Sequence, residues 1–335
     1  MTKQPTADDA LHRYRTYDAP PAGFDPRTAP QEALLHHGLP RRPDPLKEPE
    51  LARLWQQVFA RPLKYIKAEL KTNPVARRKR NALPNDPPIP SGEWGGAVVY
   101  TSDSPAPPAS NTEISARNPP KQHIASGRAN MVYAQWVVPT VSALNPAGND
   151  IQVGFWVGLD GLYGIGGQVL QAGVYATVGS GQFGGGDVAY KAFTEWWDPT
   201  NNLPEVDVPN FSVGPGDTVS FLVCAPQPDF GHVTMMNLSR GLFTSVGIPA
   251  PPGITSAGLS AEWVIEASLS ELPYFYSVEF SSCVAATEHD LIDLSQAGIS
   301  NIIGAPTGPG PVGKLLTNAY IDSPTRVVVL WQGFD

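Results

Sequence analysis

The fold is decided by stretches such as Val132-Tyr133-Ala134-Gln135-Trp136-Val137-Val138, which is rich in β-branched and aromatic residues. That composition is typical of a β-strand. Similar stretches recur along the chain, at residues 97–100, 153–158, 189–197, 217–224, 261–266 and 326–331. Clusters of Gly, Pro, Asn and Asp separate them, and helical periodicity is almost absent after residue 94. The sequence therefore predicts an all-β domain, an antiparallel sandwich or barrel.

The composition excludes several classes of protein. The 335 residues include 32 Gly and 36 Pro, and only 16% are charged, which argues against a helical bundle. No apolar run approaches the ~20 residues of a membrane span, and the first residues show no signal peptide. Two cysteines, Cys224 and Cys283, are too few for a disulfide-built fold or a Cys-rich zinc site. Whether they pair is left open.

Charge divides the chain into two parts. Residues 1–90 carry 16 Lys and Arg against 10 Asp and Glu, a net charge of +6, whereas residues 91–335 carry 7 against 21, a net charge of −14. We expect a basic, proline-rich segment over 1–90 that docks on an acidic domain over 91–335. An acidic domain argues against nucleic acid as a partner.

One helix is predicted inside the basic segment. Apolar residues at positions 51, 54, 55, 58 and 59 follow helical spacing, Pro49 suits the first turn, and Pro62 should end the helix. A single amphipathic helix cannot bury its own apolar face, so we expect it to pack on the domain. The run Arg77-Arg78-Lys79-Arg80 is either an exposed linker or a processing site.

Familiar catalytic motifs are missing. The sequence has no Gly-x-Ser-x-Gly, no His-Glu-x-x-His and no phosphate-binding loop. None of the histidines after residue 90 lies at metal-ligand spacing to another, so we predict no metal and no organic cofactor. Any enzymatic chemistry must then come from carboxylates and amides.

The strand Ala261-Glu262-Trp263-Val264-Ile265-Glu266 is the most unusual one. Alternation places Glu262 and Glu266 on one face of this strand. On a concave face, two such carboxylates would disfavour each other's ionisation, which suits general acid–base catalysis. The alternative is an exposed strand face with two solvated glutamates.

Several fragments, taken together and in order, resemble the glutamic peptidase (eqolisin) family. The resemblance covers about 240 residues, from Trp94 to the C-terminus. The matching pieces lie at 93–97 (Glu-Trp-Gly-Gly-Ala), 135–139 (Gln-Trp-Val-Val-Pro), 155–161 (Phe-Trp-Val-Gly-Leu-Asp-Gly), 169–173 (Val-Leu-Gln-Ala-Gly), 189–197, 261–266 and 277–280.

The resemblance implies a sandwich of two antiparallel sheets with a concave substrate groove, in which a Gln/Glu pair and one water cleave peptide bonds at acid pH. By motif, the pair is Gln171 and Glu266. Glu266 would take a proton from water and deliver it to the leaving amine, and Gln171 would bind the water and the oxyanion. The side chains implied to bind substrate or brace the groove are Trp94, Trp156, Asp160, Lys191, Glu195, Trp197 and Glu262.

The resemblance also implies an N-terminal pro-segment, a peptide or protein substrate and an extracellular location, although no signal peptide is visible. We expect a monomer. Two residues depart from the family pattern, Lys191 where the family has Asp and Phe193 where it has Trp. Lys191 would either favour the ionised form of Glu266 or occupy the groove. The rival interpretation is a non-catalytic sandwich that binds peptide or carbohydrate on its aromatic residues.

Overall fold

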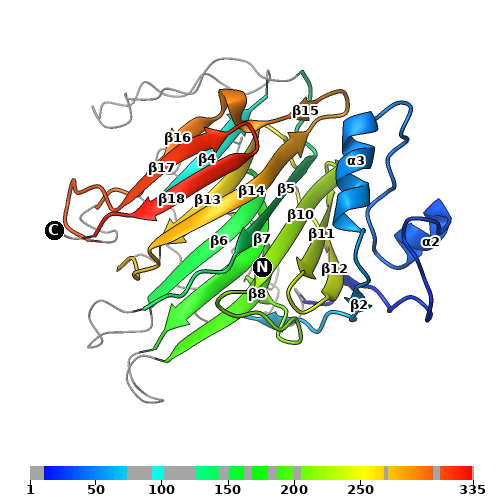
Figure 1. Ribbon diagram of the computed structural model, residues 1–335, viewed down its shortest axis with the longest axis horizontal. Coiled ribbons are helices and arrows are strands. Elements are labelled where there is room, and N and C mark those ends of the chain that lie inside the picture. The colour runs from blue at the N-terminus through cyan, green and yellow to red at the C-terminus, as the bar shows by residue number, and fades with distance from the viewer. Residues whose placement is uncertain are drawn as a thin grey trace, which may run out of the picture.

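The computed structural model describes residues 11–73, 93–101, 126–142, 151–161, 168–179, 187–198, 205–267, 271–304 and 310–333. Two antiparallel sheets pack face to face, and helices are few (Figure 1). The predicted all-β sandwich is confirmed.

The first sheet has ten strands among the described residues. Its order is β1 (Arg15–Thr16), β12 (Leu242–Pro249), β11 (Phe230–Asn237), β10 (Thr218–Gln227), β5 (Met131–Val137), β14 (Ser277–Ala286), β18 (Arg326–Trp331) and β17 (Thr317–Ser323). In addition, β15 (Leu291–Ile292) pairs with β14, and β2 (Lys64–Tyr65) pairs with β12 in parallel. A 3₁₀ turn, η3 (Leu294–Gln296), follows β15.

The second sheet, called the site sheet below, has eight strands within the described ranges. Its order is β16 (Gly298–Ser300), β4 (Trp94–Tyr100), β13 (Ser260–Ala267), β6 (Ile151–Asp160), β7 (Val169–Val178), β8 (Val188–Trp197), β9 (Val206–Asp207) and β3 (Lys71–Thr72). Five of these strands carry the residues that the sequence marked as a site.

The core lies between the two sheets. On β13 the odd-numbered residues, such as Trp263 and Ile265, are buried in this core, as the alternation predicted. The indole N–H of Trp263 donates to the carbonyl of Tyr133 on β5 at 2.9 Å, which ties the two sheets together. The even-numbered residues of β13 therefore point to the outer face of the site sheet.

The N-terminal segment pairs with edge strands of both sheets and covers part of the outer face of the ten-stranded sheet. It contains α2 (Gln31–His36) and α3 (Pro49–Val58), and α3 begins and ends close to where the prolines predicted. β1 and β2 both pair with β12 in the ten-stranded sheet, whereas β3 pairs with β9 at the edge of the site sheet. The segment thus contacts both sheets.

Helix α3 lies over the ten-stranded sheet at the β11–β12 end (Figure 1). Trp55 and Phe59 pack with Met236 and Phe243 in a buried cluster. The predicted docking of the helix on the domain is confirmed, but the helix lies on the sheet opposite the site sheet. Among the described residues, the observed ion pairs join two groups within the segment or two groups within the domain. The described contacts between segment and domain are apolar packing, strand pairing and hydrogen bonds, such as those from Arg13 to the carbonyl of Ala250 and from Asn73 to Glu205.

Both cysteines are free, so the open question of a disulfide is answered. Burial raises the pKa of the Cys224 thiol to about 12 and raises that of Cys283 as well. Among the described residues, no helix is long and apolar enough to cross a membrane. The run at 77–80 lies outside the described residues.

Candidate active site

Strand register arranges the outer face of the site sheet in transverse rows. One row holds Glu262 on β13, Gly158 on β6, Gln171 on β7 and Glu195 on β8. Cross-strand partners point to the same face of a sheet, so these side chains share one surface. Gln171 and Glu195 are direct neighbours, and Gly158 contributes no side chain between Glu262 and Gln171.

A second row, four residues further along the strands, contains Glu266. Its members are Trp94, Glu266, Gly154, Tyr175 and Lys191. Between the two rows lies a third, with Val264, Trp156, Gly173 and Phe193. Gln171 and Glu266 therefore lie on the same face of the same sheet, with the row of Trp156 between them.

The indole of Trp156 links the two outer rows. Its N–H donates to a carboxylate oxygen of Glu266 at 3.0 Å. Its far end lies over Gly158, where an added Cβ would be only 2.9 Å from the ring. A side chain at that position would displace the indole, so glycine is needed there for the ring to lie along β6. Trp94 packs edge-to-face on Trp156 at 4.7 Å between ring centroids, which fixes the ring that holds Glu266.

Gln171 is held from the opposite side. Its amide N–H donates to Glu195 at 2.7 Å, and both side chains are only 2% exposed. The amide oxygen of Gln171 is buried and has no hydrogen-bond partner among the described residues. A buried acceptor without a donor is costly, so this oxygen is able to accept a hydrogen bond from a further donor.

Two more carboxyl groups lie near Gln171, and both are buried. Glu262 is completely buried, and neither of its carboxylate oxygens has a hydrogen-bond partner in the described structure. Burial, together with the nearby charge of Asp160, raises the pKa of Glu262 well above its usual range. Burial also raises the pKa of Asp160, although that carboxylate accepts from the backbone N–H of Leu259 and the hydroxyl of Ser256. Asp160 thus fixes the loop that leads into β13, while burial disfavours the ionised form of Glu262.

Lys191 has a partner that the sequence did not reveal. Its ammonium group bonds Asp207 on β9 at 2.9 Å, and the hydroxyl of Tyr175 donates to the other oxygen of Asp207 at 2.7 Å. The positive charge is thus matched by Asp207, so neither alternative raised for Lys191 is the contact observed. Alternation along the strand could have predicted that Tyr175 shares a face with Gln171, since it is four residues after Gln171. Asp207 belongs to a two-residue strand without a recognisable pattern.

Trp197 lies at the end of β8. It is partly buried and packs on the aromatic cluster that contains Trp94 and Trp156. The cluster also includes Phe193, the aromatic residue that departs from the family pattern. By register, Trp94, Trp156 and Phe193 lie on the same face of the site sheet as Gln171 and Glu266.

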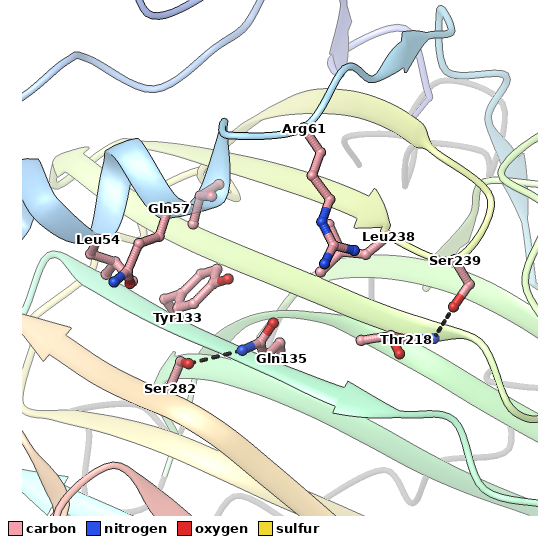
Figure 2. Close-up of a pocket in the computed structure, with 10 residues that line it drawn as sticks. Leu54, Gln57, Arg61, Tyr133, Gln135, Thr218, Leu238, Ser239 and Ser282 are labelled. Carbon is pink, nitrogen blue, oxygen red and sulfur yellow. Dashed lines mark hydrogen bonds between the residues drawn. The ribbon is translucent and has the colours of Figure 1, made fainter.

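A pocket of about 460 Å³ lies elsewhere, between α3 and the outer face of the ten-stranded sheet. Figure 2 shows Leu54, Gln57 and Arg61 of the segment facing Tyr133 and Gln135 of β5. Its lining includes none of the predicted site residues, and the bond from Gln135 to Ser282 occupies part of its floor. In the described part of the chain, no group of three or more His, Cys, Asp or Glu could hold a metal ion.

Comparison with known proteins decides the family. The family model described as the Peptidase A4 family matches residues 121–331, which is more than half of the chain. The chain belongs to the Peptidase A4 family. This family comprises the glutamic peptidases, or eqolisins, so the chain is a peptidase and the predicted resemblance is confirmed.

Solved structures show the same fold. A scytalido-glutamic peptidase bound to a transition-state analogue inhibitor is similar with a TM-score of 0.53 and 21% identity, covering 72% of this chain and 98% of that chain. SCP-B, an eqolisin in complex with the tripeptide Ala-Ile-His, is similar with a TM-score of 0.51 and 19% identity over the same shares. No curated protein matches the chain. The matched range of the A4 model contains Gln171, Glu195, Glu262 and Glu266 and begins after the N-terminal segment of residues 1–90.

The contact between Trp156 and Glu266 leads to a first prediction. Replacing Trp156 with Phe keeps an aromatic ring but removes the N–H donor that holds the carboxylate of Glu266 in place. We expect kcat to fall about tenfold, because a hydrogen bond to a charged group is lost and the carboxylate is no longer held in one orientation. Steady-state rates on one peptide measure the loss, and thermal unfolding checks that the variant is folded. An unchanged kcat would show that this N–H does not position Glu266.

Proposed function

We propose that this A4 peptidase is a glutamic endopeptidase that uses Gln171 and Glu266 to activate one water, with its optimum at acid pH. Glu266 is the general base. It accepts a proton from the water as the water attacks the scissile carbonyl carbon, and it then delivers that proton to the leaving amine. Gln171 holds the water and stabilises the oxyanion of the tetrahedral intermediate.

The observation that carries the proposal is the shared face of the two side chains, each held by a dedicated partner. Glu266 is anchored by Trp156 and is partly exposed, as a base that must reach a substrate requires. Gln171 is anchored by Glu195 and has an unsatisfied oxygen. Fixed donors and acceptors need no reorganisation during the reaction, which is the usual source of catalytic stabilisation.

Acid pH suits this face because it is crowded with carboxyl groups. Glu262, Glu195 and Glu266 share it, Asp160 is at its end, and Lys191 is already matched by Asp207. Burial favours the neutral form of Glu262 and Asp160. As pH falls, more of these carboxyl groups become neutral. The electrostatic repulsion among them, which opposes burying them under a bound peptide, then decreases.

We also propose that residues 1–90 form an inhibitory pro-segment. Its β3 strand pairs with β9, so that Lys71 lies opposite Asp207, the residue that bonds Tyr175 and Lys191. Asn73, just after β3, donates to Glu205 at 2.7 Å. The described segment therefore reaches the edge of the site sheet at the end of the row that contains Trp156 and Phe193.

A digest of denatured protein substrate across pH 2–8 tests the function. We compare the full chain with a protein that starts at Ser91, with and without a Glu266→Gln change. The proposal requires peptide-bond cleavage at acid pH that depends on Glu266 and that is faster without the segment. Tight peptide binding with no cleavage at any pH, by either length of protein, would favour the rival binding protein instead.

A further inference from the structure

We infer that Glu195 is a positioning residue whose protonation turns the amide of Gln171, and so determines which amide atoms face the substrate. The inference rests on the proposed role of Gln171. It concerns a contact that joins two strands and is independent of the contacts of Glu266.

The geometry of the pair is tightly fixed. Gln171 and Glu195 are cross-strand neighbours, and their side chains meet at 2.7 Å. The neighbouring hydroxyl of Thr194 donates to the backbone carbonyl of Gln171 at 3.2 Å. With backbone and side chains buried on both strands, the remaining freedom of Gln171 is rotation of its terminal amide.

The observed orientation matches an ionised Glu195. A carboxylate can only accept hydrogen bonds, so it draws the amide N–H toward itself. The amide oxygen is then directed away from Glu195, and it is the atom that lacks a partner. In this state Gln171 offers the substrate an acceptor and at most one N–H.

Oxyanion stabilisation needs donors rather than an acceptor. A protonated Glu195 has an O–H that can donate to the amide oxygen of Gln171. The amide then turns, its oxygen is satisfied by Glu195, and both N–H groups become available to the oxyanion. The proton comes from solvent and stays on Glu195. It is therefore not one of the protons that pass between the water, Glu266 and the leaving amine during hydrolysis.

Titratable groups of several elements lie around Glu195 in the described part of the chain. They are Tyr14 of the N-terminal segment, Glu205 just before β9, Asp207 on β9, Lys191 on the same strand and Glu262 in the same row. Burial and the charges of Glu195 and Glu205 raise the pKa of Tyr14, so its phenol stays neutral. The ammonium group of Lys191 is bonded to Asp207.

Replacing Glu195 with Gln tests the inference. The new side-chain amide can donate to the oxygen of Gln171 at every pH, so the donor orientation no longer requires acid. We expect the basic limb of the kcat profile to move up by about one pH unit or more, with about a tenfold higher kcat than wild type at pH 6.5 and little change in KM. Glu279→Gln is the matched control, since Glu279 is an exposed glutamate on β14 of the ten-stranded sheet, away from Glu195. Its basic limb should coincide with that of wild type.

Two outcomes would overturn the inference. One is a basic limb in Glu195→Gln that superimposes on the wild-type limb, and the other is the same shift in Glu279→Gln. If Glu195→Gln does not fold, Glu195→Asp retains a titrating carboxyl and should keep the basic limb while lowering kcat at all pH values. A wild-type crystal structure at pH 3.5 and at pH 7, with hydrogens located by neutrons, must show opposite amide orientations. Glu266→Gln is assayed in parallel, because activity in that variant would refute the proposed function rather than the role of Glu195.

Discussion

Replacing Glu266 with Gln is expected to lower kcat by about 10²–10⁴-fold at the acid optimum, because the reaction loses its positioned general base. The substitution is nearly isosteric. Gln keeps an oxygen that can accept the indole N–H of Trp156, so the packing of the aromatic cluster should remain. Steady-state rates on a single peptide give the loss, and the thermal unfolding midpoint should stay close to that of wild type.

Glu279→Gln is the matched control for that change. Glu279 lies on β14 in the ten-stranded sheet and forms an exposed ion pair with Arg326. Surface ion pairs contribute little to stability, and Glu279 is remote from the site sheet, so this variant should keep wild-type kinetics. Full activity in Glu266→Gln would refute the Gln/Glu mechanism.

Lowering the pH from 7 to 4 should weaken docking of the N-terminal segment about 100-fold, through His232. His232 lies on β11 beneath the segment. The ring of Tyr17 packs on it edge-to-face at 5.6 Å, and it makes a backbone hydrogen bond with Gly38. Burial lowers the pKa of His232 to about 4, and the charge of Arg15 acts in the same direction.

The sign of this effect follows from linkage. The docked state holds His232 neutral, whereas a released and solvated His232 takes up a proton near its ordinary pKa of about 6.5. Docking is therefore fully favoured above that value and is progressively lost as pH falls toward 4. The facing groups on the neighbouring strands, Cys224 and Gly247, add no charge that would offset protonation.

Hydrogen exchange of the full chain measures the docking. Amides of β1 should lose protection between pH 7 and pH 4, after correction for the intrinsic exchange rate, more than amides of the central strand β5. His232→Gln removes the titration while keeping a donor for Gly38, and it should flatten the pH dependence. His289→Gln, an exposed histidine in the domain, serves as control. Equal pH dependence in wild type and His232→Gln would exclude this histidine as the cause.

Local pattern was sufficient for much of the fold. Period-two alternation placed Trp263 in the core and the glutamates of β13 on the outer face, and the prolines at 49 and 62 framed α3. The pattern did not predict the hairpin of β11 and β12, where Gly, Met and Ser residues interrupt the apolar alternation. The opposite net charges of the segment and the domain predicted where the segment docks even less well. Net charge describes long-range attraction, whereas the docking position depends on the contacts that bury surface.

The sequence by itself determined the sandwich, the A4 family resemblance and the strands that carry Gln171 and Glu266. Each of these depends on residues close together in the chain, where alternation and motif spacing act. Tertiary structure alone decided the rows of the site sheet. Register across strands joined Gln171 to Glu195, set Trp156 against Glu266, and gave Lys191 its partner in Asp207. These contacts join residues 16 to 110 positions apart, so no local pattern could have specified them.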